Sequence, residues 1–247
     1  MLSKTHTKYI QSLQHKKFRD EHKLFIAEGP KVMLDLLESR KFNCKELFAL
    51  EDWINENQQV LSTLTAISPI PLKNFELKKI SALSTPNQVL AVFEKRNEIA
   101  DAHHTGKITL LLDTIQDPGN LGTIIRIADW FGVPAIICSE ACADMYNPKV
   151  VQSTMGSLGR VEIIYTDLVA WLKKNKGIKI YSASLNGKRV QSFGRIKEGI
   201  IIIGNEAHGI SEELMHLVNE KITIPKTGSA ESLNAAVATG IILSHVV

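Results

Sequence analysis

Three glycine-containing loops carry the side chains of this 247-residue chain that are best suited to chemistry. They are DPGNLG (117–122), GNEAHG (204–209) and PKTGSAESLN (225–234), and each follows an apolar run. Glycine lets the backbone of such loops approach a ligand closely. Between them the loops offer amides, a hydroxyl and a carboxylate: Asn120, Asn205, Glu206, Ser232 and Asn234. This set predicts a polar site that orients its ligands without a metal cluster.

Arg126 adds a cation just inside the helix that the first loop opens. The surrounding sequence, TIIRIA, is apolar, so we expect a buried guanidinium. A buried arginine needs a partner, either an acid such as Glu206 or a phosphate. A turn of this kind before a helix typically serves a phosphate or a nucleotide. The chain nevertheless has no GxGxxG fingerprint here, and it lacks the Lys-Ser/Thr pair of a Walker loop.

The same side chains also have purely structural interpretations. Asn120 follows Pro-Gly and is a candidate turn residue and helix cap. Glu206 is a candidate cap for the turn after it, and Ser232 is well placed to cap the last helix. His208 is interpreted as a turn residue, because no Ser/His/Asp arrangement is recognisable.

A parallel sheet is needed to bring the three loops together. After residue 107 the pattern alternates between strands and helices: ITLLLD (108–113), GNLGTIIRIADWFG (119–132), PAIICS (134–139), NPKVVQSTMGS (147–157), VEIIY (161–165), DLVAWLKKN (167–175), IKIYSAS (178–184), GIIIIG (199–204), KITIP (221–225) and SLNAAVATGIILSHVV (232–247). The four-isoleucine run predicts a strand buried on both faces, as in parallel sheets. Ligands bind at the carboxyl ends of such strands, where all three loops fall.

The N-terminal part predicts a separate, smaller α/β module. Its expected elements are a basic amphipathic helix (about 7–19), the strand LFIAE (24–28), the helix PKVMLDLLES (30–39), the strand ELFAL (46–50), an uncertain middle region, the helix LKNFELKKIS (72–81) and the strand QVLAVFE (88–94). The polar stretch EKRNEIADAHHTGK (94–107) separates it from the rest. We therefore expect a module over 1–96, a linker over 97–106 and a second domain over 107–247.

Charge and composition narrow the class of protein. Residues 1–31 hold seven lysines and arginines against three acids, while the whole chain has a net charge of +3. Such a basic segment suggests contact with a polyanion, and a solvated helix face is the alternative. No apolar run reaches the length of a membrane span, and the start is polar and basic. Three cysteines without a nearby Cys or His pair predict buried thiols in a reducing cytoplasm, with neither disulfides nor zinc.

The three loops lie in segments that resemble a known family. DPGNLGTIIRIADWFG, IIIIGNEAHGIS and ITIPKTGSAESLNAAVATGIIL resemble, in this order, motifs one, two and three of the SpoU (TrmH-type) RNA 2'-O-ribose methyltransferases of the SPOUT superfamily. FRDEHKLFIAEGPKVMLDLLES (18–39) resembles the substrate-binding module that precedes the catalytic domain in many members. The resemblance therefore covers nearly the whole chain.

The resemblance implies more than the residue pattern does. It implies an α/β chain whose C-terminal parallel-sheet domain holds S-adenosylmethionine in a trefoil knot, preceded by the small RNA-binding module. It also implies a homodimer whose active site is completed at the subunit interface. By position, the cofactor contacts are Gly204, Ile224 and Leu233, and the catalytic group is Arg126, Asn120, Glu206, Ser232 and Asn234. In the N-terminal module, Lys16, Lys17 and Arg19 are expected to contact RNA.

The expected reaction is methylation of a ribose 2'-hydroxyl in RNA, most readily ribosomal RNA because of the N-terminal module. Arg126 is often interpreted in this family as the general base, but a guanidinium has a pKa above about 12. We expect it instead to grip a phosphate and to stabilise the developing alkoxide. The alternatives are a transfer RNA methyltransferase or a non-catalytic RNA-binding protein. A nicotinamide-dependent oxidoreductase would need a glycine fingerprint that the chain lacks.

Overall fold

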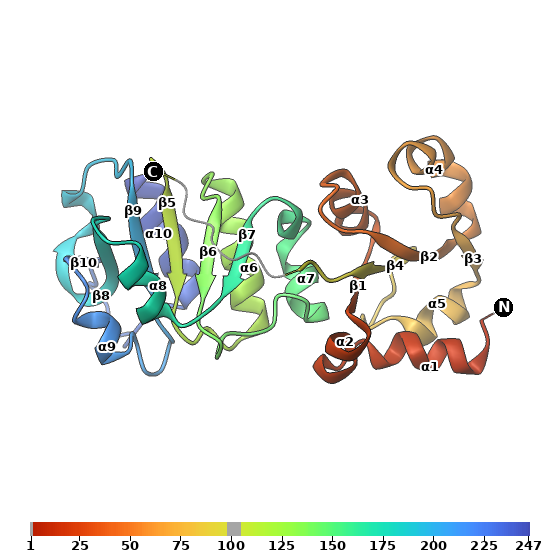
Figure 1. Cartoon of the computed structure of the whole chain (residues 1–247), viewed down its shortest axis with the longest axis horizontal. Helices are drawn as coiled ribbons and strands as arrows, with labels where there is room; N and C mark the ends of the chain where they lie inside the picture. Colours follow the sequence, from red (N-terminus) through yellow and green to blue (C-terminus); the bar gives the residue numbers. More distant parts are fainter. Residues whose placement is uncertain (1, 98–104) are drawn as a thin grey trace. The chain divides into compact units, whose positions relative to one another are not determined.

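The chain forms two compact units, which a computed structural model describes over residues 2–97 and 105–247 (Figure 1). Unit 1 comprises Met1–Asn97 together with Asp144–Gly159, and unit 2 comprises Glu98–Ala143 together with Arg160–Val247. The segment 144–159 thus groups with unit 1, although it lies inside the range 107–247 expected for the second domain. Most of the expected linker, 98–104, lies outside the described residues.

Unit 2 is built on a six-stranded sheet with the order β10-β8-β9-β5-β6-β7. All five pairings are parallel, as the sequence pattern predicts. The strands are β5 (Ile108–Leu112), β6 (Ala135–Cys138), β7 (Glu162–Tyr165), β8 (Ile180–Arg189), β9 (Gly199–Ile203) and β10 (Glu220–Thr223). The isoleucine run forms β9, which is buried along its whole length between β8 and β5.

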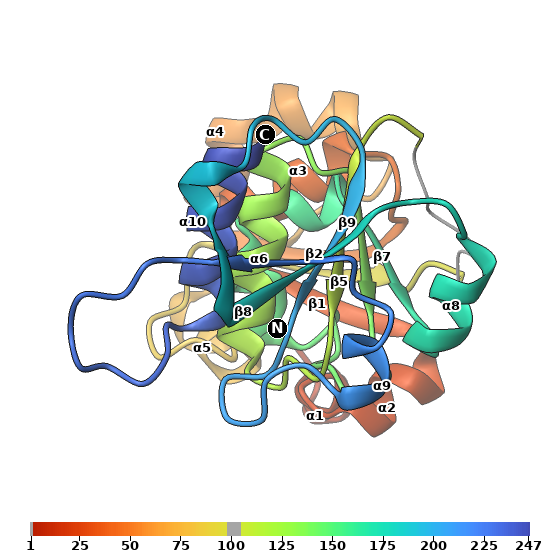
Figure 2. The same cartoon turned by 90° about the vertical axis from the view of Figure 1, so that its left-hand side faces the viewer.

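Helices cover both faces of this sheet, as buried parallel strands require. They are α6 (Pro118–Trp130), α8 (Leu168–Lys174), α9 (Glu212–Met215) and α10 (Ala235–Val246). Alternate strand residues such as Leu111, Ile137 and Ile202 share one core with α8 and α9. On the opposite face, α6 and α10 lie side by side (Figure 2). No described helix is both long and apolar enough to cross a bilayer. The trefoil knot remains a prediction.

Unit 1 contains a mixed four-stranded sheet with the order β1-β4-β2-β3. The strands are β1 (Leu24–Glu28), β2 (Cys44–Leu50), β3 (Ile70–Leu72) and β4 (Val89–Glu94). The helices are α1 (Lys4–Ser12), α2 (Lys16–His22), α3 (Pro30–Glu38), α4 (Glu51–Leu64), α5 (Asn74–Ile80) and α7 (Pro148–Thr154). The uncertain middle region is therefore α4 and β3.

The expected helix over 7–19 is in fact two helices, α1 and α2, separated by residues 13–15. Arg19 Nη1 donates to the carbonyls of Leu13 at 3.0 Å and Gln14 at 2.8 Å. Those carbonyls lie at the end of α1, where a continuous helix would have used them for its own hydrogen bonds. The break is thus stabilised by a side chain that local periodicity does not reveal.

Helix α7 packs in unit 1 because of contacts made on both sides of it. Before the helix, the Tyr146 ring lies 4.8 Å from that of Phe25, centroid to centroid. After the helix, Gly156 has a φ of +92°, and a Cβ there would lie 2.4 Å from Asp35 Oδ2. Only glycine fits both the left-handed backbone and this close approach to α3.

Candidate active site

The three glycine-containing loops follow β5, β9 and β10, at the carboxyl edge of the parallel sheet of unit 2. Asp113 and Thr114, which precede the first loop, are hydrogen-bonded to the second loop and to Ser211 just after it. Asn205 Nδ2 donates to the carbonyl of Thr114 at 2.9 Å. The carboxylate of Asp113 accepts the backbone N–H of Ser211 at 2.8 Å. The prediction that these loops share one edge is therefore confirmed.

Gly204, the first residue after β9, stands where the second loop folds back on the strand. The N–H of Asn205 donates to the carbonyl of Gly209 at 3.0 Å, and the N–H of Gly209 donates back at 2.9 Å. A Cβ on residue 204 would lie 2.4 Å from the carbonyl carbon of Gly209. The turn therefore requires glycine at 204.

Three side chains, one from each motif, form a hydrogen-bonded chain. Asn234 Nδ2 donates to Asn120 Oδ1 at 2.8 Å, and Asn120 Nδ2 in turn donates to Glu206 Oε1. Asn120 and Glu206 are 86 positions apart in the sequence, and Asn120 and Asn234 are 114 positions apart. The hydrogen bond from Asn120 thereby fixes the position of the Glu206 carboxylate in the second loop.

The capping roles differ from those expected. Helix α6 begins at Pro118 and is capped by Asp117, whose carboxylate accepts the N–H of Asn120 at 2.8 Å. Helix α10 is capped by Asn234, whose Oδ1 accepts two backbone N–H groups at 3.0 and 3.2 Å. The expectation that Ser232 caps the last helix is wrong, because the helix starts two residues later. Asn120 lies inside α6 and caps nothing.

A cavity of about 460 Å³ opens between the second and third loops and the middle of β8. Five predicted site residues line it: Gly204, Glu206, Ile224, Ser232 and Leu233. Its other walls are largely apolar: Ala183, Leu185, Ile203, Ile210, Ile222, Pro225, Ala235, Ala238 and Ile242. Asn120 and Asn234 adjoin the cavity through Glu206 rather than lining it.

Three residues of β8 and two charged residues of the third loop also line the cavity, although they were not among the predicted site residues. Ala183, Ser184 and Leu185 do so because β8 is inserted between β9 and β10 in the sheet. The order of strands in a sheet cannot be deduced from a single sequence, so no local signal places these three residues at the cavity. Lys226 and Glu231 lie within the third quoted motif, but they were not among the predicted site residues.

Arg126 is exposed, so the expectation of a buried guanidinium is wrong. Ile124, Ile125 and Ala128 are the residues of this stretch that α6 buries. Arg126 lies on the outer face, four residues before Trp130, whose exposure is 84%. Among the described residues Arg126 has no hydrogen-bond or ion-pair partner, and the partner of Glu206 is Asn120. Its guanidinium is therefore available to an external anion.

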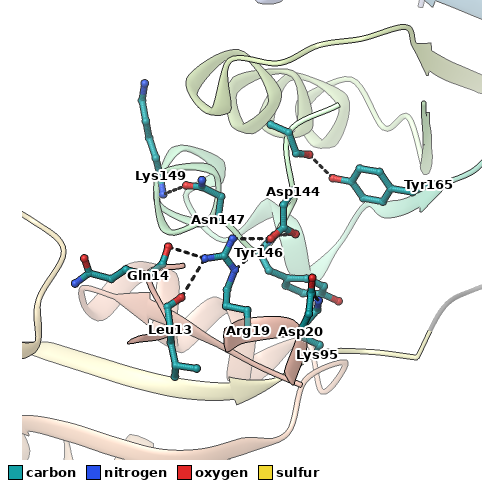
Figure 3. Close-up of polar contacts among 11 residues, drawn as sticks. Leu13, Gln14, Arg19, Asp20, Lys95, Asp144, Tyr146, Asn147, Lys149 and Tyr165 are labelled. Carbon is teal, nitrogen blue, oxygen red and sulfur yellow. Dashed lines mark hydrogen bonds and ion pairs between the residues drawn. The ribbon is translucent and has the colours of Figure 1, made fainter. Parts of the chain in front are cut away.

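The three cations expected to contact RNA differ in their surroundings. Lys16 and Lys17 are exposed on α2, whereas Arg19 is 1% exposed. Arg19 Nε and Nη2 donate to Asp144 Oδ2 at 3.1 and 2.7 Å, and Nη1 donates to the two carbonyls at the end of α1 (Figure 3). The assignment of Arg19 to RNA contact is thus corrected, because its donors are engaged inside unit 1.

The two cysteines of unit 2 lie behind the first loop. Cys142 Sγ accepts the N–H of Ile115 at 3.2 Å, and both Cys138 and Cys142 are buried. A hydrogen bond from the Cys138 thiol is the main cause that lowers the pKa of Cys142 to about 7, and hydrogen bonds from other donors add to it. The same hydrogen bond and burial raise the pKa of Cys138. Among the described residues no group of three His, Cys, Asp or Glu side chains is arranged to hold a metal ion.

Comparison with protein-family models gives two matches. The model described as the SpoU rRNA Methylase family matches residues 107–244, which is more than half of the chain. The model described as the MRM3-like substrate binding domain matches residues 4–91. Both the segment with the three loops and the N-terminal module are therefore accounted for.

Individual proteins match over nearly the full length. The chain is 31% identical to the 23S rRNA (guanosine(2553)-2'-O)-methyltransferase RlmP of Bacillus subtilis, covering 96% of this chain and 93% of that protein. A TrmH-family protein from Porphyromonas gingivalis is 35% identical with a TM-score of 0.85, covering 99% and 98%. An AdoMet-bound rRNA methyltransferase from Sinorhizobium meliloti is 29% identical with a TM-score of 0.87, covering 99% and 95%.

Proposed function

Because this chain belongs to the SpoU rRNA methylase family, we propose that it transfers the methyl group of S-adenosylmethionine to a ribose 2'-hydroxyl of ribosomal RNA. The observation that carries the proposal is the chain Asn234–Asn120–Glu206, which joins all three motifs beside a cavity. A non-catalytic RNA-binding protein would not need this arrangement. The side chains expected for the reaction are all present.

S-adenosylmethionine is the methyl donor, and the cavity suits it. A volume of about 460 Å³ falls within the range of small-molecule sites, roughly 300–1,000 Å³. Isoleucines 203, 222 and 224 offer apolar contact for a nucleoside, and the turn after Gly204 forms part of the same wall. When bound, the cofactor supplies an activated sulfonium methyl group. Gly204, Ile224 and Leu233 are the residues that we assign to its contacts.

The protein side chains must then orient a poor nucleophile and stabilise its charge. A ribose 2'-hydroxyl reacts only when it is aligned with the methyl group and its proton is accepted or stabilised. We assign the hydrogen-bonded pair Asn120 and Glu206, and Ser232, which lines the same cavity as Glu206, to this orientation. Arg126, exposed and without a partner among the described residues, is free to grip the neighbouring phosphate with its planar fork.

A homodimer is proposed to complete the site. Trp130 and Arg126 lie four residues apart on the exposed face of α6, where such side chains are neighbours. Helix α10, which lies beside α6, exposes Val237, and Leu233 just before it is also exposed. Asn234 bonds Asn120 near the start of α6. Leu233 and Val237 therefore lie toward that end of the helix, and Trp130 lies at the other. Exposed apolar side chains along both helices are suited to an interaction surface. A second subunit on this surface would cover Trp130 and place Arg126 at the interface.

Ribosomal RNA is the proposed substrate, and unit 1 is proposed to capture it. The match to a substrate-binding domain over residues 4–91 supports this role, as does the rRNA named for a relative that covers 96% of the chain. Lys16 and Lys17 are exposed and suited to phosphate contact. We place the reaction in the cytoplasm, in keeping with the free thiols of Cys138 and Cys142.

Mapping of ribose methylation in total RNA tests the proposal and identifies the target. RNA from a strain that lacks this gene is compared with RNA from its parent. We expect one ribosomal nucleotide to lose its 2'-O-methyl group, while the methylation of transfer RNA is unchanged. Loss at a transfer RNA position would favour the alternative substrate. An unchanged map of both RNAs would contradict the proposed function.

A further inference from the structure

Two charged residues line the cavity without a part in the proposed chemistry. Lys226 and Glu231 both belong to the loop between β10 and α10, and both are exposed. Lys226 Nζ donates to the carbonyl of Ala230 at 3.0 Å. This hydrogen bond joins the two ends of the segment 226–230 and places the ammonium group of Lys226 at Ala230, the residue before Glu231. A positive and a negative side chain are therefore presented by one short segment.

The charge pattern of the cavity narrows what each residue can bind. Among the residues that line it, all of which the structure describes, Lys226 is the one lysine and there is no arginine. The two carboxylates are Glu206 and Glu231. Glu206 already accepts a hydrogen bond from Asn120, on the side of α6. Lys226 and Glu231 thus remain as the pair that a zwitterionic group would meet.

We propose that Lys226 and Glu231 form the subsite for the amino-acid end of S-adenosylmethionine, an inference that rests on the proposed function. That end of the cofactor carries a carboxylate and an ammonium group on the same carbon atom. Lys226 binds the carboxylate with the donors that Ala230 leaves free, since an ammonium group has three. Glu231 accepts from the cofactor ammonium. The pair selects the intact cofactor over nucleosides that lack this end.

Calorimetric titration of the full chain with three ligands tests the subsite. S-adenosylmethionine carries both charges, its decarboxylated form lacks the carboxylate, and 5'-methylthioadenosine lacks the whole amino-acid end. The variants are Lys226→Met, which keeps the length of the side chain, and Glu231→Gln, which keeps its shape. Lys197→Met is the matched control, because Lys197 is exposed and does not line the cavity.

We expect Lys226→Met to weaken S-adenosylmethionine binding by about fivefold, as for a solvent-exposed ion pair, and to leave the decarboxylated ligand unaffected. Glu231→Gln weakens the binding of both S-adenosylmethionine and its decarboxylated form, because both carry the ammonium group. Neither variant changes the affinity for 5'-methylthioadenosine, and the control changes nothing. Equal losses for all three ligands, or no loss for any, would overturn the subsite. Failure of the unaltered chain to bind S-adenosylmethionine would instead overturn the proposed function.

Discussion

Asn234 performs two tasks with one side chain. Its Oδ1 caps α10 by accepting from the N–H groups of Ala236 and Val237, and its Nδ2 donates to Asn120. Stability and site geometry therefore meet in a single amide. They can be separated, because an aspartate keeps the acceptor oxygens and removes the donor.

The Asn234→Asp variant is expected to keep nearly the same free energy of unfolding as the unaltered protein, because the helix cap is retained. Its turnover should fall about tenfold, because Asn120 is no longer oriented. Asn234→Ala should show the same loss of turnover and should also lose about 1 kcal/mol of unfolding free energy, the usual cost of a missing cap. Denaturant titration and steady-state kinetics measure the two effects. An aspartate variant with unaltered turnover would show that the amide chain is only structural.

The exposure of Arg126 allows its role in the reaction to be tested separately from protein stability. It is exposed and has no partner among the described residues, so its removal leaves no buried charge uncompensated. Arg126→Ala should therefore keep the stability and cofactor affinity of the protein while losing most of its turnover. Arg126→Lys should recover little, because a point charge cannot copy a planar fork. Single-turnover rates and calorimetry decide this, and a lysine variant near the unaltered rate would refute the bidentate role.

At this scale the sequence predicted which side chains come together, but not all of their environments. The glycine-containing loops after predicted strands were enough to place Asn120, Glu206 and Asn234 at one edge. The environment of Arg126 was predicted wrongly, because apolar neighbours in sequence were taken to surround it. In a helix Ile125 and Ile127 point about 100° to either side of Arg126, so neighbours along the chain say little about which face a residue occupies.

At the scale of elements, α7 and the α1–α2 break depend on one buried ion pair within unit 1. Arg19 donates to Asp144 and to the carbonyls that end α1, so it fixes the helix break and the entry to the 144–159 segment together (Figure 3). The alternation of strands and helices predicted α7, but it predicted one continuous helix where α1 and α2 stand. It could not predict that α7 belongs to the N-terminal unit, because that depends on contacts 125 residues apart.

Arg19→Ala should lower the free energy of unfolding by about 3–5 kcal/mol, since it leaves the carboxylate of Asp144 without its buried partner. Chemical denaturation followed by circular dichroism measures this. The matched control is Lys16→Gln with Lys17→Gln, which should leave stability unchanged because both side chains are exposed. An arginine variant as stable as the control would contradict the structural role of Arg19.

The control pair has its own expected effect on RNA. Loss of two phosphate contacts should weaken RNA binding and flatten its dependence on salt by about one unit of slope per contact. Cofactor affinity should not change, because Lys16 and Lys17 belong to unit 1 and the cavity to unit 2. Equal affinities for the double variant and the unaltered protein across a salt series would show that these lysines are only solvated.

At the scale of the whole molecule, the chain passes between its two units three times, near residues 97, 143 and 159. This interleaving cannot be derived from composition or periodicity, which suggested one linker between two consecutive domains. The second subunit is likewise invisible to periodicity. What the sequence offered was an almost uniformly apolar last helix, which must be covered on every face.

Trp130→Asp is expected to convert a dimer into a monomer, because it places a charge in the proposed apolar interface. Val60→Asp on α4 is the matched control, since Val60 is also an exposed apolar residue but lies in unit 1. Light scattering measures the mass of both variants. A Trp130→Asp protein with the mass of the unaltered protein, or an unaltered protein that is itself monomeric, would contradict the interface.

The central claim is tested most directly by following the methyl group. The purified protein is incubated with ribosomal RNA that lacks the modification and with S-adenosylmethionine carrying a deuterated methyl group, and the digested nucleosides are analysed by mass spectrometry. We predict a single deuterated nucleoside whose fragments place the label on the ribose. A label on a base, or no labelled nucleoside from protein shown to bind the cofactor, would contradict the account.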